Sequence, residues 1–209
     1  MMDLHELRTT TKTGLPLILS PFTVDDIERV WQLCQDPEIQ RWTLVPSPYP
    51  PSAAESYVKE WAPPAWNELA AGTFSSVDAG PELTWGVRVA DGPLAGLWGS
   101  LGLIRRGGGQ FEIGWWLGAA ARGYDIMRAA AAEAIAAAFD PTTPLQATSV
   151  IWRAFIGNLA SAKVAQHLGF AYTGLAEQTA DGHGPSWTGI IHPGDPIAPR
   201  DDWPPLPEQ

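Results

Sequence analysis

A strand, a short turn and a helix start between Phe111 and Met127 carry the residue types of an anion-binding site. Residues 111–117 are apolar and aromatic on both faces apart from one acid, as in a strand that is buried on both sides. Small residues and Arg122-Gly123 follow, and an alanine-rich helix is expected over 125–139. The first amides of a helix lack intrahelical partners and lie at the positive end of its dipole. The turn is therefore suited to hold a phosphate, with Arg122 as a charge-assisted donor.

The acid within that strand, Glu112, is a candidate general base. Alternation places it on the face of Gly114 and Trp116, where partial desolvation would make a carboxylate more basic. The alternative is a structural glutamate paired with Arg105 or Arg106 of the neighbouring strand. The residues by themselves favour the structural role.

Asn158 and Ser161 lie three residues apart at the start of an expected helix, 158–167, so their side chains share one face of its first turn. An amide and a hydroxyl in this position can contact a ligand. They can equally be an N-cap and an ordinary first-turn hydroxyl. The residues by themselves leave both alternatives open.

The histidines do not indicate a metal site. They are His5, His167, His183 and His192, and they have neither metal-ligand spacing nor cysteines or paired acids nearby. His183 falls in a glycine-rich turn at 181–184 and is expected to be an exposed loop residue, with a place at the mouth of a substrate site as the alternative.

Two of these segments together resemble the GNAT superfamily of N-acetyltransferases, in particular the RimJ/RimL-like ribosomal-protein type. The family's strand Glu-Ile-Gly-aromatic-Trp-Leu is present at 112–117, and a loop similar to Arg-Gly-x-Gly-x-Ala follows at 122–127. A segment similar to the family's Asn-x-x-Ser-x-x-Val and Leu-Gly-Phe spans 158–170. The loop departs from the pattern twice, with Asp125 at the usual second glycine and Met127 at the usual alanine or glycine.

The resemblance implies direct transfer of an acetyl group from acetyl-CoA to a primary amine, on a protein N-terminus or a small molecule. It implies that the cofactor contacts Trp116, Leu117, Arg122, Gly123, Tyr124, Asp125, Ile126, Met127, Asn158 and Ser161. Within this set, the loop wraps the diphosphate, and the first turn of the later helix meets the pantetheine arm.

The resemblance also implies a catalytic role for two residues. Glu112 would take the amine proton, directly or through a water, and Ser161 would donate a hydrogen bond to the leaving thiolate. A backbone N–H near Trp116 or Leu117 would hold the developing oxyanion.

Asp125 leaves a second function open. A carboxylate beside a diphosphate is unfavourable unless it points away, which it would do as an N-cap of its own helix. If Asp125 and Met127 impair the loop, the alternative is a non-catalytic protein that binds an acyl-CoA or another ligand on the same fold. A third alternative is an interaction module whose cleft is closed by tryptophans.

Composition narrows the class of partner. The 209 residues include 45% hydrophobic and 17% charged residues, as in a globular domain, and the formal net charge is −10. That charge disfavours nucleic acid and favours amine-bearing acceptors. The single cysteine, Cys34, excludes an internal disulfide and a cysteine-rich zinc site. The sequence shows neither a leader nor an apolar run of membrane length, so a cytoplasmic protein without a membrane partner is expected, and a homodimer remains open.

The expected fold is α/β, a single GNAT-like domain over 15–193 between a flexible N-terminus, 1–14, and a proline-rich tail, 194–209. A mixed, twisted, seven-stranded sheet with helices on both faces is expected, with a splay between strands 4 and 5. The expected strands are 15–21, 83–90, 94–104, 111–117, 146–152, 171–177 and 187–192. The expected helices are 23–34, 52–61, 125–139 and 158–167.

Overall fold

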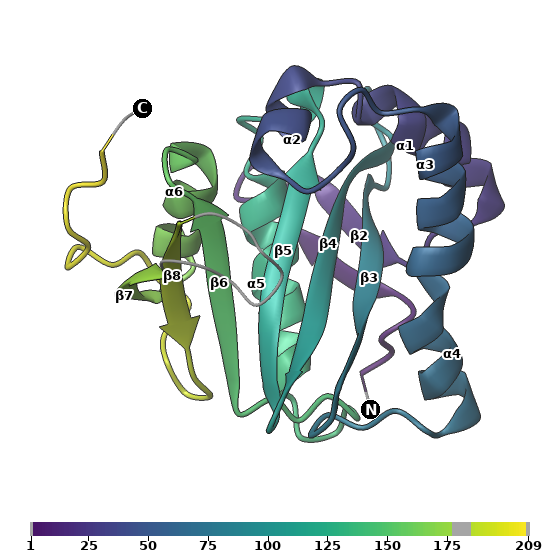
Figure 1. The fold of residues 1–209 in the computed structure, drawn as a ribbon. Helices are drawn as coiled ribbons and strands as arrows, with labels where there is room; N and C mark the ends of the chain where they lie inside the picture. Colours follow the sequence, from purple (N-terminus) through teal and green to yellow (C-terminus); the bar gives the residue numbers. More distant parts are fainter. Residues whose placement is uncertain (1, 177–184, 208–209) are drawn as a thin grey trace.

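The computed structural model describes residues 2–176 and 185–207, which form an eight-stranded sheet in the order β1-β2-β3-β4-β5-β6-β8-β7 (Figure 1). The strands are β1 (Leu7–Thr10), β2 (Pro16–Ser20), β3 (Ala79–Val89), β4 (Gly96–Gly107), β5 (Gln110–Leu117), β6 (Ser149–Phe155), β7 (Ala171–Ala176) and β8 (Ser186–Ile191). The α-helices are α1 (Ile27–Leu33), α2 (Pro37–Trp42), α3 (Pro51–Ser56), α4 (Pro63–Ala71), α5 (Ile126–Phe139) and α6 (Leu159–His167). Short helical turns are η1 (Val24–Asp26), η2 (Tyr57–Trp61) and η3 (Ala119–Ala121). The turn expected at 181–184, with His183, lies outside the described residues.

The N-terminal segment differs from the flexible end that was expected, and it adds a strand. Residues 7–10 form β1, which pairs antiparallel with β2. Leu4 and Leu7 are buried in the main core, and the indole N–H of Trp85 donates to the Leu4 carbonyl at 2.8 Å. The hairpin turn closes at Gly14, whose φ of 82° suits glycine. The sheet has eight strands rather than seven because burial of these two leucines stabilises the hairpin.

Helices cover both faces of the sheet, which confirms the expected α/β architecture. The alanine-rich α5 packs with Phe111 and Ile113 in the main core, and Figure 1 shows α5 behind the sheet. On the opposite face, α1 and α3 enclose a smaller core that includes Val30 and Ala54, and Trp116 packs against it. Alternate residues of β5 therefore face different helical layers, so the side that carries Trp116 is available for a site.

The predicted splay is confirmed between β5 and β6. Their parallel pairing ends at Ile113↔Trp152. Beyond that point β5 continues to Leu117 along β4, whereas β6 continues to Phe155 along β8. Backbone groups on the facing edges of the two strands consequently have no ladder partner across the gap.

The position of β6 corrects the strand expected at 146–152. Gln146 has a φ of 40°, and the next amide, Ala147 N–H, donates to the Ala138 carbonyl at the end of α5. A left-handed residue followed by a bond back to a helix cannot belong to an extended strand. The strand therefore starts only at Ser149.

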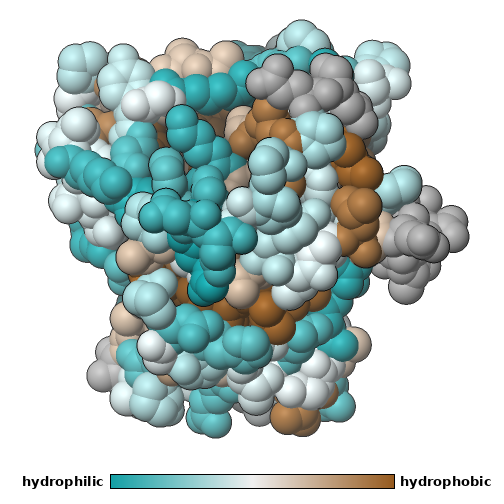
Figure 2. Space-filling model, turned by 90° about the vertical axis from the view of Figure 1, so that its left-hand side faces the viewer, coloured by the Kyte–Doolittle hydropathy of each residue, from teal (hydrophilic) through white to brown (hydrophobic). Residues whose placement is uncertain are grey.

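The proline-rich tail packs on the β7 side of the sheet. The indole N–H of Trp203 donates to the Phe170 carbonyl at 2.7 Å, and its ring lies 5.6 Å from that of Trp152. Figure 2 shows this side of the molecule, where hydrophilic side chains predominate and apolar ones form separate patches. Within the described part of the chain, no helix is both long and apolar enough to cross a bilayer.

Candidate active site

A cavity of about 680 Å³ lies on the Trp116 face of the sheet, and its lining extends to the first turn of α6. Aromatic and aliphatic side chains from α2, the loop after it, α3, η2 and β6 form most of its wall. They include Trp42, Leu44, Tyr49, Tyr57, Trp61 and Phe155. The charged residues among its described lining are Glu82, Arg106, Glu112 and Arg153. The site is thus an apolar cleft with two carboxylates and two guanidinium groups on the strands of the sheet.

Four of the site residues predicted from the sequence meet in this cavity. Glu112 and Trp116 come from β5, and Asn158 and Ser161 come from the start of α6. Residues 117–127 are not among the described residues that line it. Instead, the loop lies at the end of β5 and the start of α5, beyond the splay. The predicted site therefore has two parts, a cavity and a helix terminus, joined along β5.

Glu112 makes the ion pair that was considered as its structural alternative. The Nε of Arg106 donates to its Oε2 at 2.9 Å, and the Nε of Arg153 lies 3.5 Å from the same oxygen. Arg105 does not take part, since it faces the other side of β4 and pairs with Glu68. Glu112 is therefore fixed by two guanidinium groups at the wall of the cavity.

Glu82 is a second acid of the cavity, which the sequence analysis did not identify. It lies on β3, near the hydroxyls of Tyr57 and Ser100, which share a hydrogen bond of 2.8 Å. Burial raises the pKa of Glu82 to about 7, and the charge of Glu112 acts in the same direction, whereas Arg106 opposes it. An isolated acid in an apolar strand was the available signal, but the strand was expected to begin only at residue 83.

The first turn of α6 combines a cap with a hydroxyl that lines the cavity. The Asn158 side-chain oxygen accepts from the Ser161 amide at 3.1 Å, as an N-cap does. The Ser161 hydroxyl oxygen accepts from the indole N–H of Trp152 at 3.0 Å. Because that bond uses only a lone pair, the Ser161 hydrogen can be donated into the cavity.

The end of β5 presents backbone amides to the splay. Gly118 N–H donates to the Trp98 carbonyl of β4 at 2.8 Å. In an antiparallel ladder the direction of the backbone N–H groups alternates along the strand. The amide of Trp116 therefore points to β4, like that of Gly118, whereas the amides of Trp115 and Leu117 point into the gap. Of the two oxyanion donors considered from the sequence, the geometry favours Leu117.

The start of α5 offers uncapped amides. No side chain caps the helix, and the side chains of Ile126 and Met127 are buried in the core, so these residues can contact a ligand only through their backbone. Gly123 has a φ of 84°, and Tyr124 is 48% exposed. The terminus therefore presents backbone amides that suit an anion, and the Met127 side chain points into the core rather than toward them.

Asp125 occupies the N-cap position, but the expected cap bond is absent, so that prediction was wrong. Its φ of 64° turns the side chain away from the helix amides. The carboxylate instead accepts from Arg128 Nε at 2.6 Å and from the Lys12 amide at 3.2 Å. The Arg128 hydrogen bonds lower the pKa of Asp125 and balance its charge. The left-handed backbone explains why glycine is usual here in the family pattern, and aspartate is among the residues that tolerate it.

Arg122 is placed at the same terminus, where it is already paired. Its Nε donates to the Leu117 carbonyl at 3.1 Å, and its guanidinium forms an ion pair with Asp36, the N-cap of α2. The side chain is nevertheless 41% exposed. It joins α2 to the end of β5 and keeps donors available on its exposed side.

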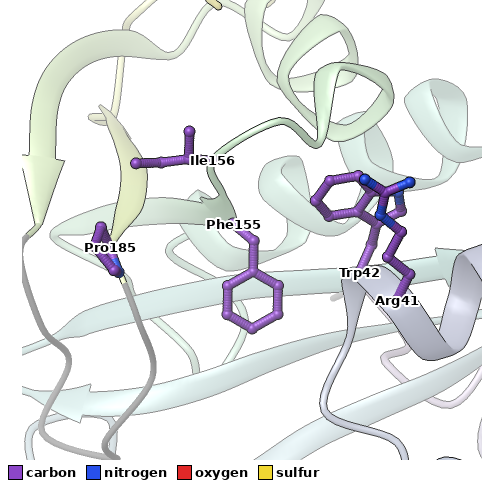
Figure 3. A pocket seen from close by; sticks show the side chains of 5 residues that line it. All are labelled: Arg41, Trp42, Phe155, Ile156 and Pro185. Carbon is purple, nitrogen blue, oxygen red and sulfur yellow. The ribbon is translucent and has the colours of Figure 1, made fainter. Parts of the chain in front are cut away.

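A second, shallower hollow of about 400 Å³ adjoins the mouth of the cavity. Figure 3 shows its lining, with Arg41 and Trp42 from α2 opposite Phe155, Ile156 and Pro185. The Arg41 guanidinium lies 4.5 Å from the centre of the Trp42 ring. Trp42 and Phe155 also line the main cavity, so the two hollows share a wall.

Comparison with known proteins identifies the family. The model of the acetyltransferase (GNAT) domain family matches residues 16–171. A comparison with functionally curated proteins gave no sequence match. Among solved structures, RimJ of Mycobacterium smegmatis in complex with CoA-disulfide is 17% identical, with a TM-score of 0.69 over 90% of this chain and 87% of that chain.

Two further structures share the fold. RimL, a ribosomal alpha-N-protein acetyltransferase in complex with coenzyme A, is 14% identical, with a TM-score of 0.65 over 84% of this chain and 93% of that chain. The microcin self-immunity acetyltransferase MccE, in complex with acetyl-CoA and AMP, is 14% identical, with a TM-score of 0.65 over 84% of this chain and 92% of that chain. Together with the domain match, the fold shows that this chain belongs to the GNAT family and is an acetyl-CoA-dependent acetyltransferase.

Proposed function

We propose that this acetyltransferase moves the acetyl group of acetyl-CoA directly to a primary amine, on a protein N-terminus or a small molecule. The observation that carries the proposal is the single cavity in which the acids of the sheet, Glu82 and Glu112, and the Ser161 hydroxyl border the splay. Such a cleft holds amine and thioester in attacking geometry, which can contribute roughly 7–11 kcal/mol to the rate.

The donor groups fit acetyl-CoA. The uncapped start of α5 supplies amides for the diphosphate, with Arg122 on its exposed side. The unpaired edge of β5 supplies amide and carbonyl groups along the pantetheine arm, and Leu117 N–H would hold the thioester oxygen in the transition state. Ser161 would donate to the thiolate as the C–S bond breaks.

The acceptor enters from the opposite side, between η2 and the loop after α2. Trp61 and Leu44 are 73% and 63% exposed at this mouth, and both line the cavity. An apolar rim above two carboxylates suits an amine that is carried on an apolar group. The name of the RimL neighbour, a ribosomal alpha-N-protein acetyltransferase, favours a protein N-terminus as the source of that amine, and a small amine is the alternative.

A panel of acceptors tests this function. Purified protein is mixed with acetyl-CoA and with peptides of varied first residue, polyamines, aminoglycosides and aromatic amines, and CoA release is followed with a thiol reagent. We expect amine-dependent CoA release for one class of amine in the panel. The mass of that acceptor should increase by about 42 daltons, because an acetyl group replaces a hydrogen. Binding of acetyl-CoA without acetylation of any amine would contradict the proposal.

A further inference from the structure

The residue expected to be the base is already held by cations. Glu112 receives a hydrogen bond from Arg106, and Arg153 lies within ion-pair distance of the same oxygen. Both contacts engage the same oxygen, Oε2, so this side of the carboxylate faces the cations of the sheet rather than an incoming amine.

Glu82 reaches the same cavity from another strand. Its side chain crosses from β3 over β4 at Gly102, where a Cβ on that glycine would lie 1.6 Å from the Glu82 Oε1. Any residue with a side chain at position 102 would displace the carboxylate. Gly102 therefore determines where the acid lies on this face of the sheet.

The glycine row continues from Gly102 toward the splay. Gly102 pairs with Gly114 of β5, and a Cβ on Gly114 would meet nothing within 4 Å. Neighbouring strands lie about 4.8 Å apart, so roughly one strand width of open space separates the Glu82 carboxylate from the gap that begins after Ile113. An amine over Gly114 would contact Glu82 on one side and a thioester in the gap on the other.

Among the residues that the structure describes, two charged groups act on Glu82. The Glu112 carboxylate on β5 and the Arg106 guanidinium on β4 act on it electrostatically, and it in turn acts on the Tyr57 hydroxyl of η2. Burial keeps the pKa of Tyr57 above its usual range, so this hydroxyl stays neutral beside the acid. Among the described residues, Glu82 has neither of the ion pairs that hold Glu112, and its pKa of about 7 lies in the range that suits a general base.

We propose that Glu82, rather than Glu112, accepts the proton of the incoming amine, and that the paired Gly102 and Gly114 form the path along which the amine reaches the thioester. The inference rests on the proposed function and names the base of the same site. Glu112, with Arg106 and Arg153, is then a positioning residue that shapes the electrostatic surroundings of Glu82.

The acceptor enters as an ammonium ion and gives one proton to the Glu82 carboxylate, which later releases it to solvent. The free amine forms a C–N bond to the thioester carbonyl, and the C–S bond breaks with its electron pair on sulfur. The second proton leaves the nitrogen of the adduct for the CoA thiolate, with Ser161 as hydrogen-bond donor to that sulfur.

The test uses Glu82→Gln with Glu112→Gln as its matched control, on the amine that the acceptor panel identifies. An alkylamine is preferred, because its own pKa of about 10 is well separated from that of the enzyme group. We expect kcat of Glu82→Gln to fall by roughly 10²–10⁴-fold, with unchanged calorimetric affinity for acetyl-CoA.

The pH profile gives a second readout. The parent's kcat/KM should rise through an inflection near pH 7, which Glu82→Gln abolishes. Glu112→Gln should keep the inflection but shift it to lower pH, because a negative neighbour is removed.

Gly102→Ala gives a second, independent variant. It retains both carboxylates but displaces that of Glu82, so kcat should fall while the thermal unfolding profile stays cooperative. A Glu82→Gln protein that keeps the parental turnover and inflection, or a Glu112→Gln protein that loses the inflection, would overturn the assignment.

A binding measurement separates this inference from the proposed function. If the parent protein acetylates no amine, the proposed transfer reaction is wrong. The role of Glu82 at the amine position is then tested by calorimetry, as the affinity of the CoA-loaded protein for phenethylamine. We then expect at least a tenfold loss in Glu82→Gln relative to the parent. Equal affinities would overturn the role of Glu82 at the amine position.

Discussion

At the scale of single residues, the two glutamates of the cavity show how surroundings divide chemical roles. Both come from apolar strands and both face the same space, yet Glu112 is paired with Arg106 whereas Glu82 lies over Gly102. Burial raises the pKa of Glu82 to about 7, although the charge of Arg106 acts against that rise. The surroundings of Glu82, and not its residue type, therefore bring its proton exchange near neutral pH.

The raised pKa of Glu82 makes stability depend on pH. Its folded value of about 7 lies above the ordinary value of 4.5, so the folded state binds this proton more tightly and loses stability as the pH rises from 4.5 through 7. Glu82→Gln removes the ionised, buried carboxylate. It should raise the unfolding free energy at pH 8 by on the order of 2–3 kcal/mol and change it little at pH 4.5.

Urea unfolding of parent and variant across this pH range measures the effect. Glu112→Gln is the control, because it breaks the ion pair with Arg106 and should destabilise the protein by about 1–3 kcal/mol at pH 8. Parallel pH profiles for the parent and Glu82→Gln would contradict the perturbed carboxyl.

Asp125 carries a backbone requirement as well as a charge. Its φ of 64° is unfavourable for alanine and acceptable for glycine. Both Asp125→Gly and Asp125→Ala lose the contact with Arg128. We therefore expect the alanine variant to be less stable than the glycine variant by about 1 kcal/mol, as measured by urea unfolding. An alanine variant as stable as the glycine variant would show that the backbone conformation imposes no strain.

At the scale of elements, the proposed cofactor site depends on how β5, α2 and α5 meet. Arg122 links the end of β5 to the N-cap of α2 through Leu117 and Asp36. The uncapped amides of α5 lie directly after this junction. The arginine thus has a structural partner in the absence of cofactor, and phosphate would compete with Asp36 for it.

Two substitutions separate these roles of Arg122. Arg122→Ala should weaken acetyl-CoA binding by about 1–3 kcal/mol, as for the loss of a charge-assisted bond. Asp36→Asn keeps a capping side chain but releases the arginine, so it should leave binding unchanged or tighten it. Calorimetric titration provides both affinities. An Arg122→Ala protein with parental affinity would remove this arginine from the cofactor site.

At the scale of the whole molecule, charge and architecture act together. The net charge of −10 repels an anionic cofactor at long range and attracts a cationic acceptor. In the proposed site the local groups offset this effect, since the α5 amides would bind the cofactor and the two glutamates would face the amine. The tail packs on the β7 side of the sheet through Trp203, whose ring lies close to those of Trp152 and Tyr172.

This charge predicts opposite salt effects for the two substrates. Raising the ionic strength from 0.01 to 0.15 M shortens the Debye length from about 30 to 8 Å. We expect the KM of a cationic amine to rise several-fold, while the association rate of acetyl-CoA stays constant or increases. Stopped-flow binding and steady-state kinetics measure these quantities. A KM for the amine that is independent of salt would show that the overall charge plays no part in recognition.

The sequence by itself determined the elements whose signal is local. The buried strand with Glu112, the helix over 125–139 and the Asn158 cap all follow from periodicity, capping chemistry and small side chains, and their arrangement and the GNAT family are confirmed. The sequence also indicated the splay, because the family resemblance fixed which strands neighbour each other.

Only the tertiary structure decided the contacts between distant segments. Leu4 and Leu7 pack in the main core, and this packing orders an N-terminal segment that was expected to be flexible. Arg153 of β6 lies within ion-pair distance of Glu112 on β5, which Arg106 also contacts. Glu82 entered the cavity because β3 begins earlier than expected and a glycine on the next strand makes room for it. Burial and electrostatic pairing arise only when the strands have assembled. The neighbours on adjacent strands, and not the order of residues in the chain, therefore determine the pKa and the pairing of the acids in this site.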